Sequence, residues 1–199
     1  HKDVKVMIKS DQERVMVALQ HEIQRIRAGK TIPINSPVGE SESNGRVENA
    51  IRRVQEKVRT IKSHLESEAN TVIPEDAPVL TWLVRCAGEI ISKYNLGSDK
   101  KTAYERIRCE PCNAPIAMFG EHVWYLPLKT KATHQDKGNA KMEFGIWLGI
   151  IERSEENIIG TEKGVVKCRT VKRRPEGEQW SAEALVAVRG RTWQPTPGS

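Results

Sequence analysis

Hydrophobic and polar residues alternate over residues 3–10, which predicts a β-strand that ends just before Asp11. Apolar residues then recur at helical spacing over 12–28, and a second short strand is predicted over 31–34. A strand, a helix and a strand in this order form a βαβ unit, in which the two strands are parallel. Functional groups gather at the carboxyl ends of such strands, which is where Asp11 falls.

The next stretch predicts a loop that leads into a long helix. Residues 36–43 are rich in Ser, Glu, Pro and Gly, and a helical pattern follows over 44–68, with Asn44 near its start. Apolar residues form one stripe along this helix: Val47, Ile51, Val54, Val58, Ile61 and Leu65. Glu48 falls in the first turn at the edge of this stripe, where a fixed carboxylate can hold a metal ion.

A polar stripe also runs along the same helix, away from Glu48. Its members are Arg52, Gln55, Arg59 and Lys62. Taken alone, this stripe is typical of a solvated helix face.

The second half of the chain predicts a helix followed by short strands. The helix covers 76–95, and strands are expected over 121–126, 144–151, 157–160 and 165–171, with a long excursion over 129–141. Short strands with glycine-bearing turns favour a small barrel.

Basic residues gather in and after the last predicted strand. They are Lys167, Arg169, Lys172, Arg173 and Arg174. Two interpretations stay open, contact with nucleic acid or protection of an edge strand against aggregation.

Composition narrows the class of protein. The 199 residues suffice for one ordinary domain and a small appendage, and 38% of them are hydrophobic. The 32 Lys and Arg residues exceed the 26 Asp and Glu residues, which gives a net charge of +6 and favours a polyanionic partner. The longest apolar run, 144–151, is too short to cross a bilayer, so no membrane partner is expected.

The four cysteines do not form a disulfide framework. Cys109 and Cys112 make a single CxxC pair, and a zinc site would need two more ligands from Cys168, His122 or His134. The alternative is that these thiols are buried or incidental.

Three segments carry a resemblance to a known family. Ser43-Asn-Gly-Arg-Val-Glu48 resembles the signature that closes the active site of retroviral and retrotransposon integrases, in which the Glu is the third acid of the DDE set. Asp11 lies upstream of Glu48 at a separation similar to that between the second and third acids of this set. Thr102-Ala-Tyr-Glu-Arg106 resembles a segment of copia-type integrases, and Gly145-Ile-Trp-Leu-Gly149 is similar to part of the SH3-like module in copia-type polyproteins.

The resemblance implies an α/β fold of several parts. These are a partial RNase H-like integrase core over 1–70, a helical extension and linker over 71–118, a small SH3-like β-barrel domain over 119–175 and a tail over 176–199.

The resemblance also implies a set of site residues. Asp11 and Glu48 would be catalytic and would bind Mg²⁺ or Mn²⁺ in the complete enzyme. DNA, both the element ends and the target, would contact Asn44, the polar stripe after Glu48 and the basic residues from Lys167 to Arg174.

The family's first catalytic Asp has no counterpart here. The chain is therefore expected to be part of a longer polyprotein and inactive alone, to form a homo-oligomer in its full-length form, and to act inside the cell, in the nucleus for the integration step. The alternative function is that of a non-enzymatic nucleic-acid-binding remnant of a retroelement, in which Asp11 and Glu48 no longer bind metal.

Overall fold

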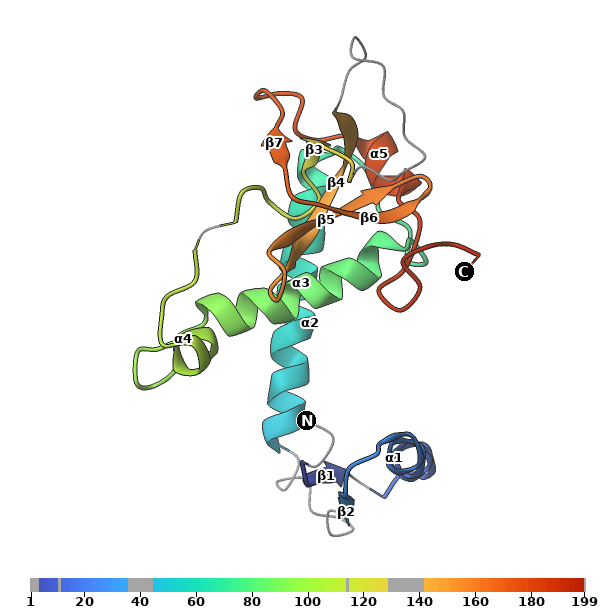
Figure 1. Cartoon of the computed structure of the whole chain (residues 1–199), viewed down its shortest axis with the longest axis vertical. Helices are drawn as coiled ribbons and strands as arrows, with labels where there is room; N and C mark the ends of the chain where they lie inside the picture. Colours follow the sequence, from blue (N-terminus) through green and yellow to red (C-terminus); the bar gives the residue numbers. More distant parts are fainter. Residues whose placement is uncertain (1–3, 11, 36–44, 114, 129–141, 199) are drawn as a thin grey trace. The chain divides into compact units, whose positions relative to one another are not determined.

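The computed structural model describes residues 4–10, 12–35, 45–113, 115–128 and 142–198. Within them the protein is mixed α/β, with five helices, a two-stranded parallel sheet and a five-stranded antiparallel sheet (Figure 1). Residue contacts divide the chain into two compact units, His1–Arg53 and Val54–Ser199. The boundary falls inside one long helix, and the expected boundaries at residues 70, 118 and 175 stay predictions. None of the described helices combines the length and the apolar character that crossing a membrane requires.

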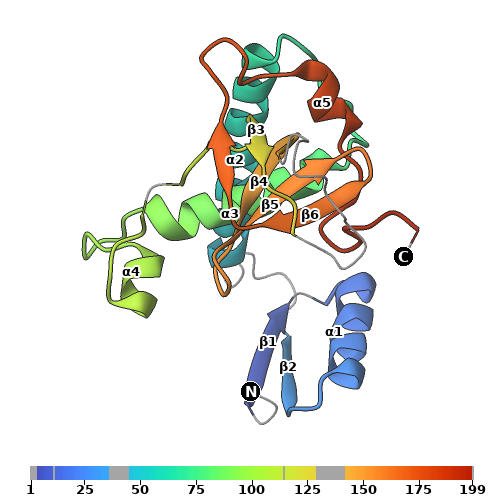
Figure 2. The same cartoon turned by 45° about the horizontal axis from the view of Figure 1, so that its top comes forward.

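The first unit contains the predicted βαβ unit. Strand β1 (Val6–Ser10), helix α1 (Arg14–Ile26) and strand β2 (Thr31–Asn35) follow one another, and α1 lies beside the two strands (Figure 2). The strands pair in parallel, from Val6 opposite Thr31 to Ser10 opposite Asn35. The alternation over the first strand and the helical spacing after it therefore predicted both the elements and the direction of pairing.

Helix α1 contacts the strands through polar side chains. Gln20 is buried, and its Nε2 donates a hydrogen bond to the carbonyl oxygen of Ile8 at 3.2 Å. Gln24 Nε2 likewise donates to the carbonyl oxygen of Thr31 at 3.2 Å. Val15 and Leu19, which carried the helical pattern, are exposed. The apolar spacing predicted the helix correctly, but part of the predicted apolar stripe is exposed.

Helix α2 (Gly45–Glu68) is the long helix that the sequence predicts. Its apolar stripe changes from exposed to buried along the helix, because Val47 and Ile51 are 56% and 52% exposed whereas Leu65 is 0% exposed. Val58 and Ile61 pack against the core of the second unit. The carboxyl-terminal half of α2 is thus anchored by the hydrophobic effect.

The second unit is built on five antiparallel strands. They are β3 (His122–Tyr125), β4 (Glu143–Ile151), β5 (Glu156–Thr161), β6 (Gly164–Cys168) and β7 (Val171–Arg173). Their order in the sheet is β6-β5-β4-β3-β7. The prediction of one strand over 165–171 was wrong, since the chain leaves β6 after Cys168 and forms β7 at the opposite edge of the sheet.

The main core of this unit joins helices to the sheet. Its helices are α3 (Val79–Tyr94) and α5 (Ala182–Ala187), and α4 (Ala103–Arg108) follows α3. Buried residues from α2, α3, β4, β5 and α5 form one cluster, among them Leu65, Trp82, Leu83, Ile146, Leu148, Ile158 and Leu185. A second cluster contains Val123, Tyr125, Trp147, Ile159 and Cys168.

The segment after residue 175, for which the sequence indicated no structure, belongs to the main core. Leu185 and Val188 are each 1% exposed. The indole Nε1 of Trp82 donates a hydrogen bond to the carbonyl oxygen of Gly190 at 3.0 Å, and the backbone N–H of Thr192 donates to Thr81 Oγ1 at 3.2 Å. These contacts hold the segment against α3.

Candidate functional site

Glu48 lies where the sequence predicts it, in the first turn of α2. Its side chain is exposed and forms no salt bridge with any described residue. It lines a cavity of about 360 Å³ together with Gly45, Asn49 and Arg52. Arg52 Nη2 donates a hydrogen bond to Asn49 Oδ1 at 3.0 Å, which orients the guanidinium within this wall. The Glu48 carboxylate is therefore accessible to a cation from solvent.

Asp11 and Asn44 lie outside the described residues, so the expected pairing of Asp11 with Glu48 stays a prediction. Their neighbours are described. Ser10 is the last residue of β1 and is paired with Asn35, the last residue of β2. Both parallel strands thus have their carboxyl ends on the same side of the two-stranded sheet, and Asp11 is the next residue in the sequence after the end of β1.

Glu48 is the member of the proposed metal-binding pair that lies within the described residues. A carboxylate is the kind of ligand that Mg²⁺ and Mn²⁺ prefer. The residues that the structure describes contain no group of three or more His, Cys, Asp and Glu side chains that could hold a metal ion. Within this part of the chain Glu48 supplies a single ligand, which is fewer than a pair of catalytic metal ions requires.

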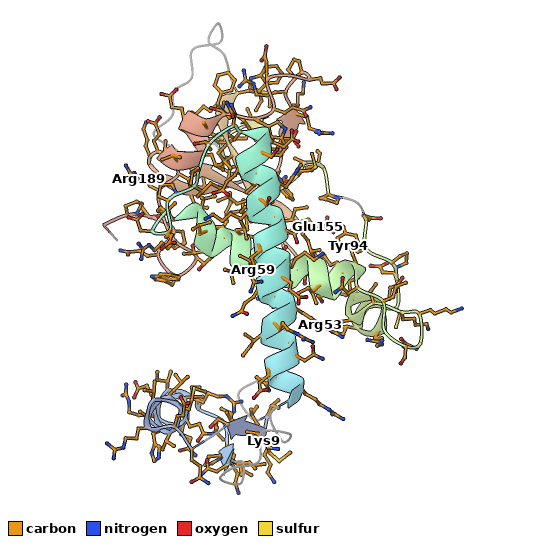
Figure 3. All side chains as sticks on the ribbon, turned by 180° about the vertical axis from the view of Figure 1, so that it is seen from behind. Lys9, Arg53, Arg59, Tyr94, Glu155 and Arg189 are labelled. Atoms are coloured by element: carbon orange, nitrogen blue, oxygen red, sulfur yellow. The ribbon has the colours of Figure 1, made fainter. Side chains whose placement is uncertain are left out.

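The polar stripe that follows Glu48 lies on α2 as expected. Gln55 and Arg59 are exposed, and Arg59 lies midway along the helix (Figure 3). Lys62 is partly buried, and its Nζ is 3.5 Å from Glu66 Oε1. Arg59 forms no salt bridge with a described residue, so its charge is available to an anion.

Arg173 has a structural role that the sequence did not reveal. Its Nε donates a hydrogen bond to Glu121 Oε1 at 2.7 Å. The side chain of Glu121 is 0% exposed, and its other oxygen accepts the backbone N–H of Met118 at 2.9 Å. The carboxylate raises the pKa of Arg173, so this guanidinium stays charged and neutralises a buried acid. Glu121 precedes an ordinary alternating strand, and nothing in the sequence marks it.

Arg174 is also held by neighbouring residues. Its Nη1 donates to His122 Nδ1 at 2.7 Å, and its Nη2 donates to Glu178 Oε2 at 2.8 Å. The guanidinium carbon lies 5.0 Å from the centre of the Phe144 ring, within cation–π range. Burial and the positive charge of Arg174 lower the pKa of His122.

The remaining basic residues of this segment are exposed but divided between the two edges of the sheet. Lys167 lies on β6 and Lys172 on β7, and Arg169 lies in the turn between these strands. The five cations therefore differ in their contacts, because Arg173 and Arg174 bind other side chains of the fold whereas the other three are exposed, and the Arg173 side chain is itself still 46% exposed. Their contact with DNA stays a prediction.

The cysteines are divided between surface and core. Cys109 is exposed, and Cys112 Sγ lies 3.3 Å from the carbonyl oxygen of Asn113. Cys168 is buried in the sheet, and this burial raises the pKa of its thiol to about 11. Cys168 is therefore a protonated core residue at neutral pH. His134 lies outside the described part of the chain.

Comparisons with known proteins find a distant structural neighbour. No protein-family model matches the sequence, and no curated protein matches it. A chain in the cryo-EM structure of the simian T-cell lymphotropic virus intasome in complex with PP2A regulatory subunit B56 gamma aligns with 86% of this chain, at 14% sequence identity and a TM-score of 0.37. The alignment spans 59% of that chain.

Proposed function

We propose that this chain is part of a copia-type retrotransposon integrase and serves DNA integration by metal-dependent phosphoryl transfer. In this proposal residues of the first unit supply two of three catalytic carboxylates, Asp11 and Glu48. Its RNase H-like core is partial, and residues 119–175 form an SH3-like module.

One observation carries the proposal. The described part of the motif, Gly45–Glu48, opens a long helix, and this helix is the next described element after a parallel βαβ unit whose first strand ends at Ser10, just before Asp11 in the sequence. A match to a short motif by itself is weak, and its structural context is the independent check. An exposed carboxylate in the first turn, beside a cavity lined by Asn49 and Arg52, is consistent with a site that admits both a cation and a phosphate.

In this proposal residues of the chain have two roles, binding of metal ions and contact with the DNA backbone. When bound, two divalent ions would activate an attacking hydroxyl and stabilise the leaving oxygen. Asp11 and Glu48 would be ligands of these ions. Arg52 would lie within reach of the phosphate backbone on the next helical turn, and Arg59 would continue that contact along α2.

The same proposal implies the binding partners, the oligomeric state and the location of the protein. The partners are the DNA ends of the element and the target DNA, and the full-length form is a homo-oligomer. Integration would take place in the nucleus.

Metal binding provides the first test. Mn²⁺ is titrated into the full chain and followed by electron paramagnetic resonance, which reports free Mn²⁺. Glu48→Gln and Asp11→Asn should each weaken binding by about tenfold, since each removes one charged ligand. Glu56→Gln, an exposed acid on the same helix, is the matched control and should leave the affinity unchanged. Equal affinity in the wild-type chain and in Glu48→Gln would refute the metal assignment.

A nicking assay tests whether the carboxylate set is incomplete. The purified chain should not cleave or join DNA in Mg²⁺ or Mn²⁺, because two carboxylates do not position both ions. Nicking that is abolished by Glu48→Gln would show that a third ligand lies within this chain.

The alternative function, a nucleic-acid-binding remnant without catalysis, is favoured by the exposed cations Arg59, Lys167 and Lys172. It predicts DNA binding that is identical in the wild-type chain and in Glu48→Gln, together with no Mn²⁺ binding. The metal titration therefore separates the two functions.

A further inference from the structure

A second cavity, of about 740 Å³, lies entirely within the second unit. Its walls come from α2, α3, α4, the segment before β3, and β4 with the turn that follows it. Apolar side chains form much of this groove: Ile61, Ile90, Tyr94, Tyr104, Met118 and Phe119. Binding sites of about 300 to 1,000 Å³ with mostly apolar walls are typical of ligand recognition.

The charged residues of the groove are mainly acidic. Glu89, Glu152 and Glu155 line it, and Lys93 is the one lysine among the described residues that line it. Lys93 Nζ lies 3.8 Å from Glu89 Oε2 and 3.3 Å from Glu152 Oε1, so its charge is already shared between two carboxylates. Glu89 Oε1 also lies 2.9 Å from Arg85 Nη2, so Glu155 is the acid of the described lining without a cationic partner among the described residues, and it gives the groove a local negative charge on a chain whose net charge is +6.

Glu155 is the carboxylate best placed for an external cation. It lies in the β4–β5 turn, where its backbone N–H donates to the carbonyl oxygen of Ile151 at 2.8 Å. Its side chain is exposed and forms no salt bridge with a described residue. Tyr94 and Glu155 both line the groove, and both are labelled in Figure 3.

We propose that this groove is the docking site for a short peptide segment of a partner protein that presents apolar side chains and at least one Arg or Lys. The apolar walls would desolvate the anchoring side chains, which is where binding energy concentrates in protein interfaces. The carboxylate of Glu155, with that of Glu152, would pair with the cation and fix the direction of the peptide. Nucleic acid is disfavoured because its phosphates would meet these carboxylates.

The margins of the groove favour a peptide over a small molecule. Tyr94 and Met118 are 45% and 46% exposed, so apolar surface extends beyond the base of the groove. A small apolar amine would fill the base and leave these two side chains in water. A peptide of several residues covers both. The groove does not involve Glu48 or the predicted DNA-contacting cations Arg52 and Arg59, so this inference is independent of the proposed function.

Peptide binding to the full chain tests the inference. The probes are fluorescein-labelled peptides of about twelve residues that contain leucine, tryptophan and arginine in varied order among serines. A second set replaces arginine with glutamate, and a third set replaces the apolar residues with serine. Fluorescence anisotropy should detect binding of the first set alone, because both the anchors and the cation are required.

Variants of the chain locate the site. Glu155→Lys should weaken binding of the arginine peptides by about tenfold, and Tyr94→Ser should weaken it several-fold. Both residues are exposed, so folding should be retained. Glu162→Lys makes the same charge change in the exposed β5–β6 turn and should leave binding unchanged. Binding that is equal for the arginine and glutamate peptides, or that is insensitive to Glu155→Lys, would overturn the proposal.

Discussion

At the residue scale, the buried pair of Glu121 and Arg173 shows why a basic cluster in a sequence is ambiguous. Arg173 was predicted to contact DNA, which stays a prediction, and the structure shows that it pairs with a carboxylate whose side chain is 0% exposed. Removing one partner of such a pair leaves a buried charge without compensation, which is far more costly than losing a surface ion pair.

Arg173→Ala should therefore lower the free energy of unfolding by about 2 to 4 kcal/mol. The estimate lies slightly below the cost for a fully buried pair, because the side chain of Arg173 is 46% exposed and water reaches it. Urea denaturation followed by circular dichroism measures the change. Lys172→Ala, the neighbouring exposed cation on β7, is the control and should change stability by less than about 0.5 kcal/mol. Similar losses for both variants would mean that Glu121 does not need Arg173.

His122 gives the fold a predicted pH dependence. Arg174 can only donate hydrogen bonds, so His122 Nδ1 must accept with its lone pair, and the imidazole is neutral. Its pKa is lowered in the folded state, so below pH 6.5 the unfolded chain takes up a proton that the folded chain resists. The contribution of His122 to stability is therefore complete above that pH and declines as the pH falls toward the lowered pKa.

The measurement is the free energy of unfolding between pH 7.5 and 5. His122→Gln keeps an acceptor for Arg174 but cannot titrate, so it should reduce the pH slope in the range below about 6.5 by up to about 1.4 kcal/mol per pH unit. His21→Gln, at an exposed position on α1, controls for loss of a histidine elsewhere. A slope that His122→Gln leaves unchanged would assign the dependence to other groups.

At the element scale, two motifs that suggested a family also have clear structural roles. Thr102 caps α4, because its side chain accepts the N–H of Glu105 at 3.0 Å while the Glu105 carboxylate accepts the N–H of Thr102 at 2.7 Å. Gly149 follows a bulge in β4 and has a φ of 131°, which side-chain-bearing residues rarely adopt. Gly145 lies where an added Cβ would clash with Ile159 Cγ2.

The capping box of α4 yields a prediction at this scale. Thr102→Ala should destabilise α4 by about 1 kcal/mol, since it leaves the N–H of Glu105 without its acceptor. Hydrogen exchange at the amides of residues 103–108 should accelerate about fivefold, and Thr102→Ser should restore most of the protection. Exchange that is unaffected by Thr102→Ala would mean that packing alone holds α4.

The sequence predicted elements better than it predicted their arrangement. Local spacing sufficed for β1, α1, β2 and α2, because each has a clear period. It failed for β6 and β7, since a continuous apolar and basic run does not show that the chain turns after Cys168 and that the next strand pairs with β3. It also missed α5, whose Leu185 is buried by contacts with residues far away in sequence. At the candidate site, the position of Glu48 was predictable from local pattern, whereas the partners of Arg173 and Arg174 depend on sheet pairing.

At the scale of the whole molecule, the two units differ in how much apolar surface they bury. Both hydrophobic clusters consist of residues from Leu65 onward. In the described part of the first unit, the buried residues are the polar Ser10 and Gln20. A two-stranded sheet with one helix is marginal without further packing.

We therefore expect the first unit to open far more readily than the second. Hydrogen exchange followed by mass spectrometry should show the amides of β1 and β2 exchanging at least about 100-fold faster than those of β4 and β5. Peptides from the carboxyl-terminal half of α2 serve as an internal reference, because Leu65 anchors that half in the core. Equal protection of both sheets would show that the first unit is stabilised by contacts beyond its own core.

DNA binding is the property that depends on the summed charge of the molecule. If Arg52, Arg59 and Lys172 contact phosphates, affinity for duplex DNA should be independent of sequence and should fall steeply with salt. Replacing all three with Ala should reduce the slope of log affinity against log salt by about three, since each contact releases roughly one counterion.

The control replaces Arg25 and Arg106, exposed cations that form salt bridges with Glu22 and Asp99. This control removes positive charge without touching the predicted contacts, so its slope should stay close to that of the wild-type chain. A slope that falls in both variants in proportion to the charge removed, three cations in the triple variant and two in the control, would assign binding to net charge alone. A slope that the triple variant leaves unchanged would make the α2 stripe an ordinary solvated face.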